Sequence, residues 1–548
     1  MSVETELDQL VLDRLDELTP SAQTVAVCVY GPTVYAQPGS YRGHDALVIC
    51  DRYANGLRTH LRYVDGHEIR YLIAERNLVE SDVQKGTLGD FLTEKLLYPY
   101  RSINNHEYLE NLGLSAKART VKEEAHDLVL EYGEMCRGLV AKPEFFGLSR
   151  MRKRARVFVP SMDDYLRFLE PPIREQNLSL LRKSFQKAIM TMRSDVVGLD
   201  ADEVTINDSA VDRWLKDRAS EQVVNILRQS QQAFYSYLSK GRAIYLNLDL
   251  LARELYTPLR LGLDPILAGR EPENPKNYLY LRTSEGLVSF NERFSLEEIV
   301  SRLRPGRTVT ISPLGGVLNE VFHVTMGREQ FVAKRFTDWH GFKWFSLNLV
   351  SLGSKLFAVS GKTRMTNEYG INRYLFKKGL KVPEIIYVSV KQRMLLEAYI
   401  SGAPLDKFVA QAVNHSVLTK TQYRLAEALG ETLARIHEVG VSVGDAKPEN
   451  FVAKDGEIYS VDLEQAGKHG DYAWDVAEIL FYSGHYSTSP TPTRGLTQMT
   501  EAFINGYLKD GNSTELKRAA GVRYAKAFSL WTPAPIIMEI SRMLREAA

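Results

Sequence analysis

The sequence predicts a multidomain α+β protein: a small α/β domain, then a helical domain, then a second domain that mixes strands and helices. Three observations carry this prediction. The chain has 548 residues, which is long for one domain. Its first hundred or so residues alternate short apolar runs with turns, and helical periodicity dominates from about residue 108 to 256. A strand, glycine turn and strand pattern returns after Arg307.

The predicted domain boundaries follow these changes of pattern. A Pro-rich stretch at 271–275 indicates a linker, and a short hairpin is expected after it at 278–290. The boundaries are therefore 1–107, 108–265, a linker with a hairpin at 266–306, and 307–548. A hydrophobic fraction of 44% is sufficient for sizeable cores in each domain.

Composition excludes several classes of protein. The 69 basic and 68 acidic residues give a net charge of +1, which favours no particular partner. Three cysteines (Cys28, Cys50 and Cys136) do not make a disulfide framework, so a reducing, cytoplasmic setting is expected. Residues 1–18 predict an acidic amphipathic helix and lack the pattern of a signal peptide. No apolar run is long enough to span a bilayer, so no transmembrane segment is expected.

The first domain is expected to contain strands at 24–30, 46–50 and 69–73. Residues 38–49 resemble the start of a nucleotidyltransferase domain of the polymerase-β type, in which a Gly-Ser turn holds a triphosphate and paired carboxylates hold two metals. Gly39-Ser40 is the matching turn and Asp45 the candidate first carboxylate, but Leu47 stands at the second position. Glu68 is either a further carboxylate or an exposed strand residue. The resemblance therefore implies a nucleotidyltransferase-like domain that has lost catalysis.

The helical domain is expected to include helices at 121–136 and 211–238. A basic cluster at 150–156 lies between them and is joined by Arg174, Arg182 and Lys183. Such a cluster is a candidate RNA-binding surface, because Lys and Arg neutralise phosphates. A solvated helix face is the alternative interpretation.

In the last domain, residues 311–324 predict two strands joined by a turn at Gly315 and Gly316. Glycines let a backbone approach phosphates closely, although a simple hairpin has the same pattern. The next strand, 331–336, carries Lys334 between apolar residues. A helix over 367–375 offers Glu368 as the acid that holds this lysine, and a surface lysine with a solvated glutamate is the alternative.

A later loop carries the most informative pattern. Asp445, Lys447 and Asn450 form the string Asp-x-Lys-Pro-Glu-Asn, and Asp462 follows in Val-Asp-Leu-Glu. Phosphoryl transfer needs such a set, because the protein mainly positions groups and neutralises phosphate charge. An Asp with an Asn five residues later and a further Asp is the pattern of kinase active sites.

On these motifs, residues 307–548 resemble the protein-kinase-like superfamily, closest to its atypical, microbial and aminoglycoside-phosphotransferase-like branches. The resemblance implies a two-lobed domain that uses ATP and Mg²⁺. It implies that Asp445 is the catalytic aspartate, that Lys447 contacts the γ-phosphate and that Asn450 and Asp462 bind magnesium. It places Gly315, Gly316, Lys334 and Glu368 around the phosphates, and Asp475 as a brace for the loop. It also implies a hinge from Glu397 to Tyr399 that offers backbone groups to adenine.

Three departures from the family pattern matter. Val443 replaces the usual His or Tyr before Gly-Asp, and Leu463-Glu464 replaces Phe-Gly after Asp462. Asp475 follows Asp462 by only 13 residues, which leaves no room for an activation loop and a peptide platform. We therefore expect neither switching by activation-loop phosphorylation nor grip on an extended peptide.

The predicted function is an ATP- and Mg²⁺-dependent phosphotransferase of the atypical serine/threonine protein kinase type, acting on a hydroxyl acceptor. Lys447 favours a protein serine or threonine, whereas the short segment after Asp462 favours a small molecule. A non-catalytic nucleotide- or RNA-binding scaffold is the third possibility. An aromatic-rich insertion at 338–362 predicts a helical cap on the domain rather than an amphipathic membrane or partner element.

Overall fold

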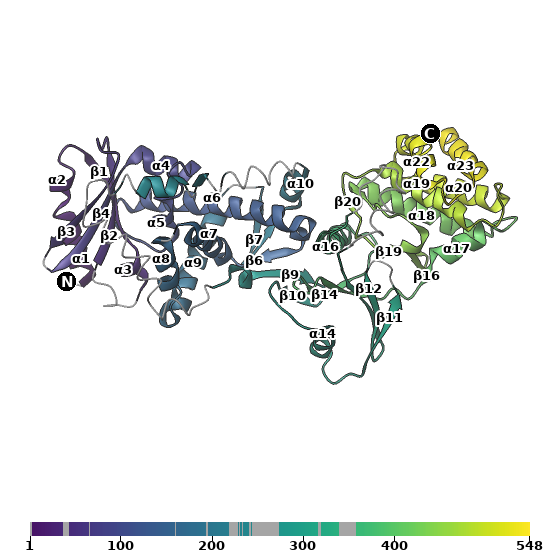
Figure 1. Cartoon of the computed structure of the whole chain (residues 1–548), viewed down its shortest axis with the longest axis horizontal. Coiled ribbons are helices and arrows are strands. Elements are labelled where there is room, and N and C mark those ends of the chain that lie inside the picture. Colours follow the sequence, from purple (N-terminus) through teal and green to yellow (C-terminus); the bar gives the residue numbers. More distant parts are fainter. Residues whose placement is uncertain are drawn as a thin grey trace. The chain divides into compact units, whose positions relative to one another are not determined.

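The computed structural model describes residues 3–36, 43–64, 66–158, 160–192, 195–216, 218, 228, 231–232, 234–240, 243, 273–315, 319–338 and 358–548. These residues form two compact units (Figure 1). Unit 1 consists of 1–130 and 140–279, and unit 2 of 131–139 and 280–548. The insertion at 338–362 lies mostly outside the described residues, and the helix expected at 211–238 is described only in part.

Unit 1 begins with a mixed five-stranded sheet in the order β3-β4-β2-β1-β5. Its strands are β1 (Gln23–Tyr30), β2 (Gly43–Asp51), β3 (Leu57–Val64), β4 (His67–Glu75) and β5 (Arg101–Asn104). Only β2 and β4 run parallel. Alternate residues of β1, β2 and β4 share one apolar face, which packs against Val11, Leu15 and Leu18. The three predicted strands are confirmed, and β3 and β5 were missed.

The candidate nucleotidyltransferase residues do not form a metal site. Asp45 lies on β2, with its Oδ1 3.4 Å from Nε of Arg70. Leu47 is fully buried two residues further along the same strand. No group of three or more potential metal-binding side chains occurs in the part of the chain that the structure describes. Gly39 and Ser40 lie outside that part.

Helices make up most of unit 1 after the sheet. They are α1 (Val3–Leu12), α2 (Leu15–Leu18), α3 (Pro32–Tyr35), α4 (Arg76–Lys85), α5 (Thr93–Leu97), α6 (His106–Tyr132), α7 (Glu144–Val157), α8 (Pro160–Phe168), α9 (Pro171–Thr191), α10 (Asp208–Lys216) and the 3-10 turn η2 (Pro275–Tyr278). This region also contains the short strands β6 (Leu139–Ala141), β7 (Val197–Asp200) and β8 (Glu203–Ile206). Residues 108–265 are therefore not purely helical.

The basic cluster at 150–156 is largely neutralised inside unit 1. Arg150 is buried, with Nε 3.2 Å from Glu124 Oε1. Arg154 is also buried, and its Nη2 lies 3.1 Å from Glu94 Oε2. Three further basic residues of the hypothesis also form ion pairs: Lys153 with Glu124, Arg174 with Glu273, and Arg182 with Glu144. Arg156 and Lys183 are exposed. These ion pairs hold α7 in place, and they lend no support to RNA binding there.

Unit 2 begins with a small lobe built on an antiparallel five-stranded sheet in the order β11-β12-β13-β15-β14. Its elements are η1 (Gly133–Arg137), β9 (Leu279–Thr283), β10 (Gly286–Ser289), α14 (Leu296–Leu303), β11 (Val309–Gly315), β12 (Glu320–Met326), β13 (Glu329–Arg335), α16 (Gly361–Lys377), β14 (Ile385–Ser389) and β15 (Met394–Ala398). α14 packs on the sheet face that carries Ala333 and Leu396. Because side chains alternate along a strand, Lys334 points to the opposite face, toward the helical lobe.

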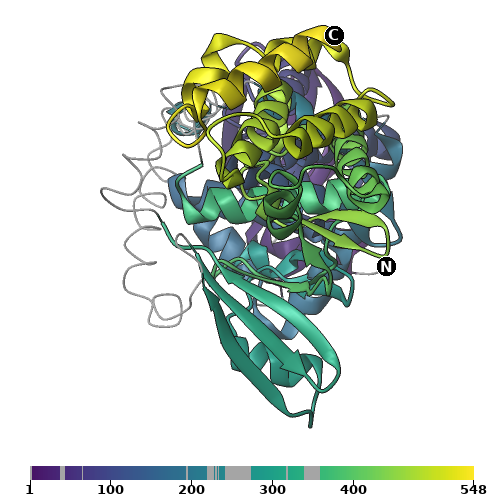
Figure 2. The ribbon, with the colours of Figure 1, turned by 90° about the vertical axis from the view of Figure 1, so that its right-hand side faces the viewer.

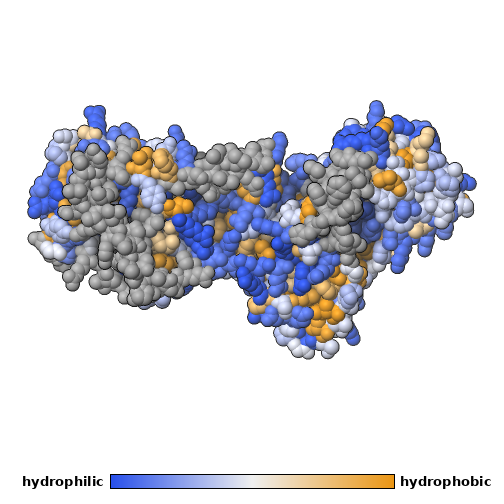
Figure 3. All heavy atoms as spheres, viewed as in Figure 1, coloured by the Kyte–Doolittle hydropathy of each residue, from blue (hydrophilic) through white to orange (hydrophobic). Residues whose placement is uncertain are grey.

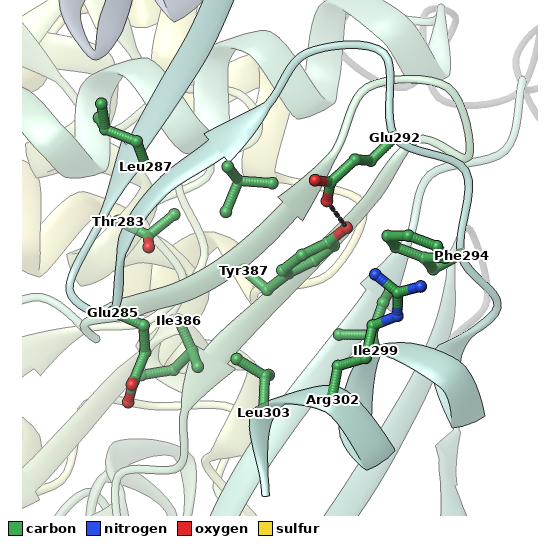
Figure 4. Close-up of a pocket in the computed structure, with 11 residues that line it drawn as sticks. Thr283, Glu285, Leu287, Glu292, Phe294, Ile299, Arg302, Leu303, Ile386 and Tyr387 are labelled. Carbon is green, nitrogen blue, oxygen red and sulfur yellow. Dashed lines mark hydrogen bonds between the residues drawn. The ribbon is translucent and has the colours of Figure 1, made fainter.

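A surface hollow of about 210 Å³ lies between the hairpin β9–β10, α14 and β14 (Figure 4). Tyr387 forms part of its wall and donates a hydrogen bond to Glu292 Oε2 at 3.0 Å. Figure 3 shows apolar side chains at the surface where Figure 1 draws these elements. The hollow lies on the α14 side of the sheet, and Lys334 points to the other side, so the hollow is separate from the surroundings of Lys334.

The helical lobe holds the largest core of unit 2. It is formed by α17 (Leu405–Ala412), α18 (Lys420–Glu438), α19 (Tyr472–Ser483), α20 (Arg494–Tyr507), α21 (Ser513–Ala519), α22 (Val522–Phe528) and α23 (Ala534–Glu546), with the 3-10 turns η3 (Pro448–Asn450) and η4 (Gly484–Tyr486). Short strands β16 (Ala403–Pro404), β18 (Phe451–Lys454) and β19 (Glu457–Ser460) form one sheet, and β17 (Val441–Ser442) pairs with β20 (Gly467–Lys468). Figure 2 shows the strands of the small lobe in teal and the C-terminal helices in yellow.

Two further observations concern the whole described chain. Cys28, Cys50 and Cys136 are buried and no disulfide joins them, as expected. Among the described residues, no helix combines the length and the apolar character needed to cross a bilayer.

Candidate active site

Lys334 lies at the centre of a buried polar cluster in unit 2. Its Nζ donates to Glu368 Oε1 on α16 at 2.7 Å and to the carbonyl oxygen of Val461 at 2.8 Å. Glu397 Oε2 on β15 lies 3.2 Å from the same nitrogen. The expected contact between Lys334 and Glu368 is therefore present, and three acceptors surround the three N–H groups of the ammonium.

The charges in this cluster depend strongly on one another. Burial alone would lower the pKa of Lys334, but the carboxylates of Glu368, Glu397 and Asp462 outweigh it and hold that pKa well above the usual value. Burial raises the pKa of Glu368 and of Glu397, and the charge of Lys334 opposes that rise. A fixed ammonium among acids is what a phosphate-binding lysine needs, because its charge must persist in a dry site.

The segment after Asp462 is held against α16. Glu368 Oε2 accepts the backbone N–H of Leu463 at 2.6 Å. Asn367, on the same helix, donates to the carbonyl oxygen of Glu464 at 3.2 Å. Glu368 thus contacts both Lys334 and the segment that carries Asp462, so one helix sets the position of both groups.

The loop that carries Asp445 is braced from α19. The fully buried carboxylate of Asp475 accepts the backbone N–H of Val443 at 2.7 Å and that of Gly444 at 2.8 Å. Gly444 has φ +80°, a conformation that glycine adopts without strain. The N–H of Ala446 donates to Glu478 Oε2 at 2.7 Å. Two acids one helical turn apart therefore fix the backbone on both sides of Asp445.

Asp445, Lys447 and Asn450 lie together on this loop. Lys447 Nζ is 2.7 Å from Asp445 Oδ1. Burial alone would lower the pKa of Lys447, but the carboxylates of Asp445 and Glu478 raise it above its usual value. Asn450 Nδ2 donates to the backbone oxygen of Asp445 at 2.8 Å and to its Oδ2 at 3.2 Å. The amide nitrogen of Asn450 therefore faces Asp445.

The expected glycine turn and hinge are only partly defined. Gly315 ends β11 with φ +93°, and Gly316 lies outside the described residues. At the hinge, the N–H of Ala398 donates to Glu384 O at 2.8 Å and that of Tyr399 to Gln330 O at 3.0 Å. These two N–H groups already form backbone hydrogen bonds. The side chain of Glu397 contacts Lys334. The sequence analysis predicted that backbone groups of 397–399 are offered to adenine, and it did not predict the contact between Glu397 and Lys334.

Other contacts were also missed. His437 Nε2 lies 3.1 Å from Asp475 Oδ2, and Tyr507 OH lies 2.8 Å from His437 Nδ1, so the brace extends into α18 and α20. Glu478 follows Asp475 by three residues, and this spacing on a helix could have identified it as a second brace. Nothing in the spacing of Asn319, Arg364 and Glu464 indicated that these residues meet.

Comparison with known proteins gives distant likenesses. No protein-family model matches the chain. A stretch of 102 residues is 24% identical to the KEOPS complex subunit Bud32 of Pyrococcus abyssi (strain GE5 / Orsay), covering 19% of this chain and 44% of that relative. The chain thus spans less than half of the relative's length.

Two solved structures resemble about half of the chain. WaaP in complex with acyl carrier protein is 13% identical with a TM-score of 0.29, over 47% of this chain and 99% of that one. The Mycobacterium tuberculosis PknI kinase domain is 15% identical with a TM-score of 0.25, over 44% and 96%. These TM-scores are too low to rest an argument on. The description of unit 2 rests instead on its own sheet, its Lys334–Glu368 pair and its braced Asp445 loop.

Proposed function

We propose that the chain is an ATP- and Mg²⁺-dependent phosphotransferase that moves the γ-phosphate of ATP to the hydroxyl group of an acceptor. One observation carries the proposal: Glu368 joins the ammonium of Lys334 to the backbone of the segment that holds Asp462. A domain that only bound nucleotide would not need this linkage together with a separately braced Asp445. The geometry supports a catalytic assembly over a scaffold for that reason.

The roles of the residues follow from their chemistry. Asp445 orients the acceptor hydroxyl and takes its proton as the acceptor oxygen bonds to the γ-phosphorus and the β–γ bridging oxygen leaves with ADP. Lys447, next to Asp445, neutralises charge that develops on the transferred group. Lys334 holds the α- and β-phosphates, and the turn at Gly315 covers them.

The donor set fits magnesium. Asp462 supplies a carboxylate and Asn450 an amide oxygen, and both are hard oxygen ligands. Mg²⁺ in such sites takes one or two protein carboxylates and completes its shell with phosphate oxygens and water. When bound, the ion neutralises phosphate charge.

The acceptor is proposed to be a protein serine or threonine, because Lys447 belongs to the loop version typical of protein kinases. One observation favours a small-molecule hydroxyl instead. After Asp462 the chain forms β20 and then enters α19 at Tyr472, so no peptide platform intervenes. An aminoglycoside-phosphotransferase-like acceptor is therefore the second candidate.

Parallel incubations of the purified full chain with Mg²⁺ and γ-labelled or α-labelled ATP test the proposal. We expect γ-label on protein from the wild type and from Asp510→Ala, a surface control, and none from Asp445→Ala. Label from the α position would instead indicate nucleotidyl transfer by unit 1. If no label is transferred to protein, transfer of labelled phosphate to added aminocyclitols tests whether the acceptor is a small molecule. Failure of both assays in a protein that still binds ATP would favour the scaffold.

A further inference from the structure

Glu464 stands where the kinase pattern has a glycine, and its side chain is buried. Its Oε2 accepts from Asn319 Nδ2 at 2.6 Å and from Arg364 Nη1 at 3.0 Å. Arg364 Nη1 also donates to Asn319 Oδ1 at 2.6 Å. The three side chains therefore form a closed triangle of hydrogen bonds, here called the Glu464 triangle.

The members of the Glu464 triangle come from three parts of the site. Asn319 directly precedes β12, the strand that pairs with β11. Arg364 lies on α16 one turn before Glu368, and Glu464 follows Asp462 by two residues. The triangle thus connects the start of β12, the helix that holds Lys334 and the segment that carries Asp462.

Arg364 strengthens the connection between these three parts of the site. Its side chain is fully buried, and it also donates to the carbonyl oxygen of Thr337. An unpaired guanidinium in the interior is costly, so the carboxylate of Glu464 is the group that permits its burial. Arg364, Asn367 and Glu368 lie three and four residues apart, on one face of α16, and all three contact 463–464.

We propose that Glu464 is a positioning residue for phosphoryl transfer, which holds the segment of Asp462 against α16 and the start of β12 through Arg364 and Asn319. The inference rests on the proposed function. In kinases with an activation loop, phosphorylation of that loop controls whether the corresponding helix and metal-binding Asp are in place. In this chain the side chains of the Glu464 triangle, which are already in contact, hold α16 and the segment of Asp462 in place. The site therefore assembles without a phosphorylation step.

The test measures binding of a fluorescent ATP analogue to the full chain while Mg²⁺ is titrated. Glu464→Gln removes the charge and keeps the shape. Arg364→Met combined with Glu464→Met removes the buried pair as a unit, which often leaves stability nearly unchanged. Glu329→Gln, which breaks the ion pair between Glu329 and Arg304 in the same lobe, is the matched control.

For both triangle variants we expect the Mg²⁺ concentration at half-maximal analogue binding to rise about tenfold, the usual effect of removing a group that orients a metal ligand. Glu329→Gln should behave like the wild type. A Tm that falls in Glu464→Gln, with an unchanged Mg²⁺ requirement in both triangle variants, would show a purely structural role and overturn the inference. A wild type that binds no ATP analogue would overturn the proposed function itself, and the inference with it.

Discussion

Glu397 Oε2, on β15, lies 3.2 Å from the Nζ of Lys334. Lys334 also contacts Glu368 and the carbonyl oxygen of Val461, so its three N–H groups have three acceptors before any phosphate arrives. A phosphate oxygen that binds Lys334 must displace one of these acceptors. Under the proposed function we expect Glu397 to be displaced, because the other two acceptors belong to α16 and to the segment that carries Asp462.

Glu397→Gln should therefore tighten nucleotide binding. The substitution removes a negative charge that competes with phosphate for Lys334 and repels it, and we expect a gain of about tenfold in affinity, or about 1.4 kcal/mol. Titration with a fluorescent ATP analogue at fixed Mg²⁺ measures it. Glu384→Gln changes an exposed carboxylate just before β14 and should have no effect. Weaker binding in Glu397→Gln would mean that this acid supports the lysine instead of competing for it.

Asp475→Asn should uncouple the Asp445 loop from the helical lobe. The carboxylate accepts from two backbone N–H groups through different oxygens, and an asparagine would place an NH₂ donor against one of them. The expected cost is about 1–3 kcal/mol for the group left without an acceptor. We expect turnover to fall at least a hundredfold, while affinity for the ATP analogue changes less than threefold because Lys334 and Asp462 remain in place.

The control for that prediction is Asp471→Asn. Asp471 precedes the same helix, and its carboxylate contacts Arg518 and Tyr524 at the surface instead of the loop. Its turnover should stay near the wild-type value. Equal losses in both variants would point to general damage to α19 and not to loss of the brace.

Gly370→Ala should displace α16. A Cβ at Gly370 would lie 2.1 Å from the backbone oxygen of Glu134 in η1, and backbone cannot move aside as a flexible side chain can. Alanine is the better helix former by about 1 kcal/mol, but overpacking costs about 1–3 kcal/mol and should dominate. Because Glu368 is on this helix, we expect a lower Tm and weaker binding of the ATP analogue together.

Gly467→Ala is the matched control, since nothing lies within 4 Å of a Cβ added there. That variant should keep the wild-type Tm and nucleotide affinity. A higher Tm in Gly370→Ala would mean that η1 moves to accommodate the new methyl group. The close packing of α16 on η1 would then not be what fixes the helix.

The sequence predicted local helices and strands better than contacts between distant side chains, and the difference has a physical cause. Local patterns predicted several elements that the structure contains: the strand around Lys334, the helix around Glu368 and three of the five strands of the first sheet. Each is encoded by periodicity over a few residues. The pairing of Lys334 with Glu368 followed because the kinase pattern fixes both the order and the purpose of the two residues.

Contacts between side chains far apart in sequence could not be read in this way. Asn319 and Glu464 are separated by 145 residues, and neither has a pattern that points to the other. The hypothesis of an RNA-binding surface at 150–156 lacks support for a related reason. Charge alone indicated a surface for phosphates, but Arg150 and Arg154 are buried against acids from other helices, and burial depends on tertiary packing.

A buried lysine in unit 1 predicts a pH dependence of stability. Lys117 on α6 is 5% exposed, and its Nζ donates to the carbonyl oxygen of Leu96 at 2.6 Å. Burial lowers the pKa of Lys117 from its usual 10.5 to about 8. Between these two pH values the unfolded chain binds more protons than the folded one, so the free energy of unfolding should rise with pH over this window.

The size of the effect follows from the shift, which corresponds to about 3 kcal/mol between pH 7 and pH 10.5. Lys117→Met lacks the titrating group, so its stability relative to the wild type should be greatest near pH 7 and should decline by that amount as the pH rises. Other lysines and tyrosines titrate in both proteins and cancel in the difference. Chemical denaturation at pH 7, 8.5 and 10 measures it, with the exposed Lys122→Met as control. A difference between wild type and Lys117→Met that stays constant with pH would mean that Lys117 keeps an ordinary pKa in the folded state, with its ammonium in contact with water.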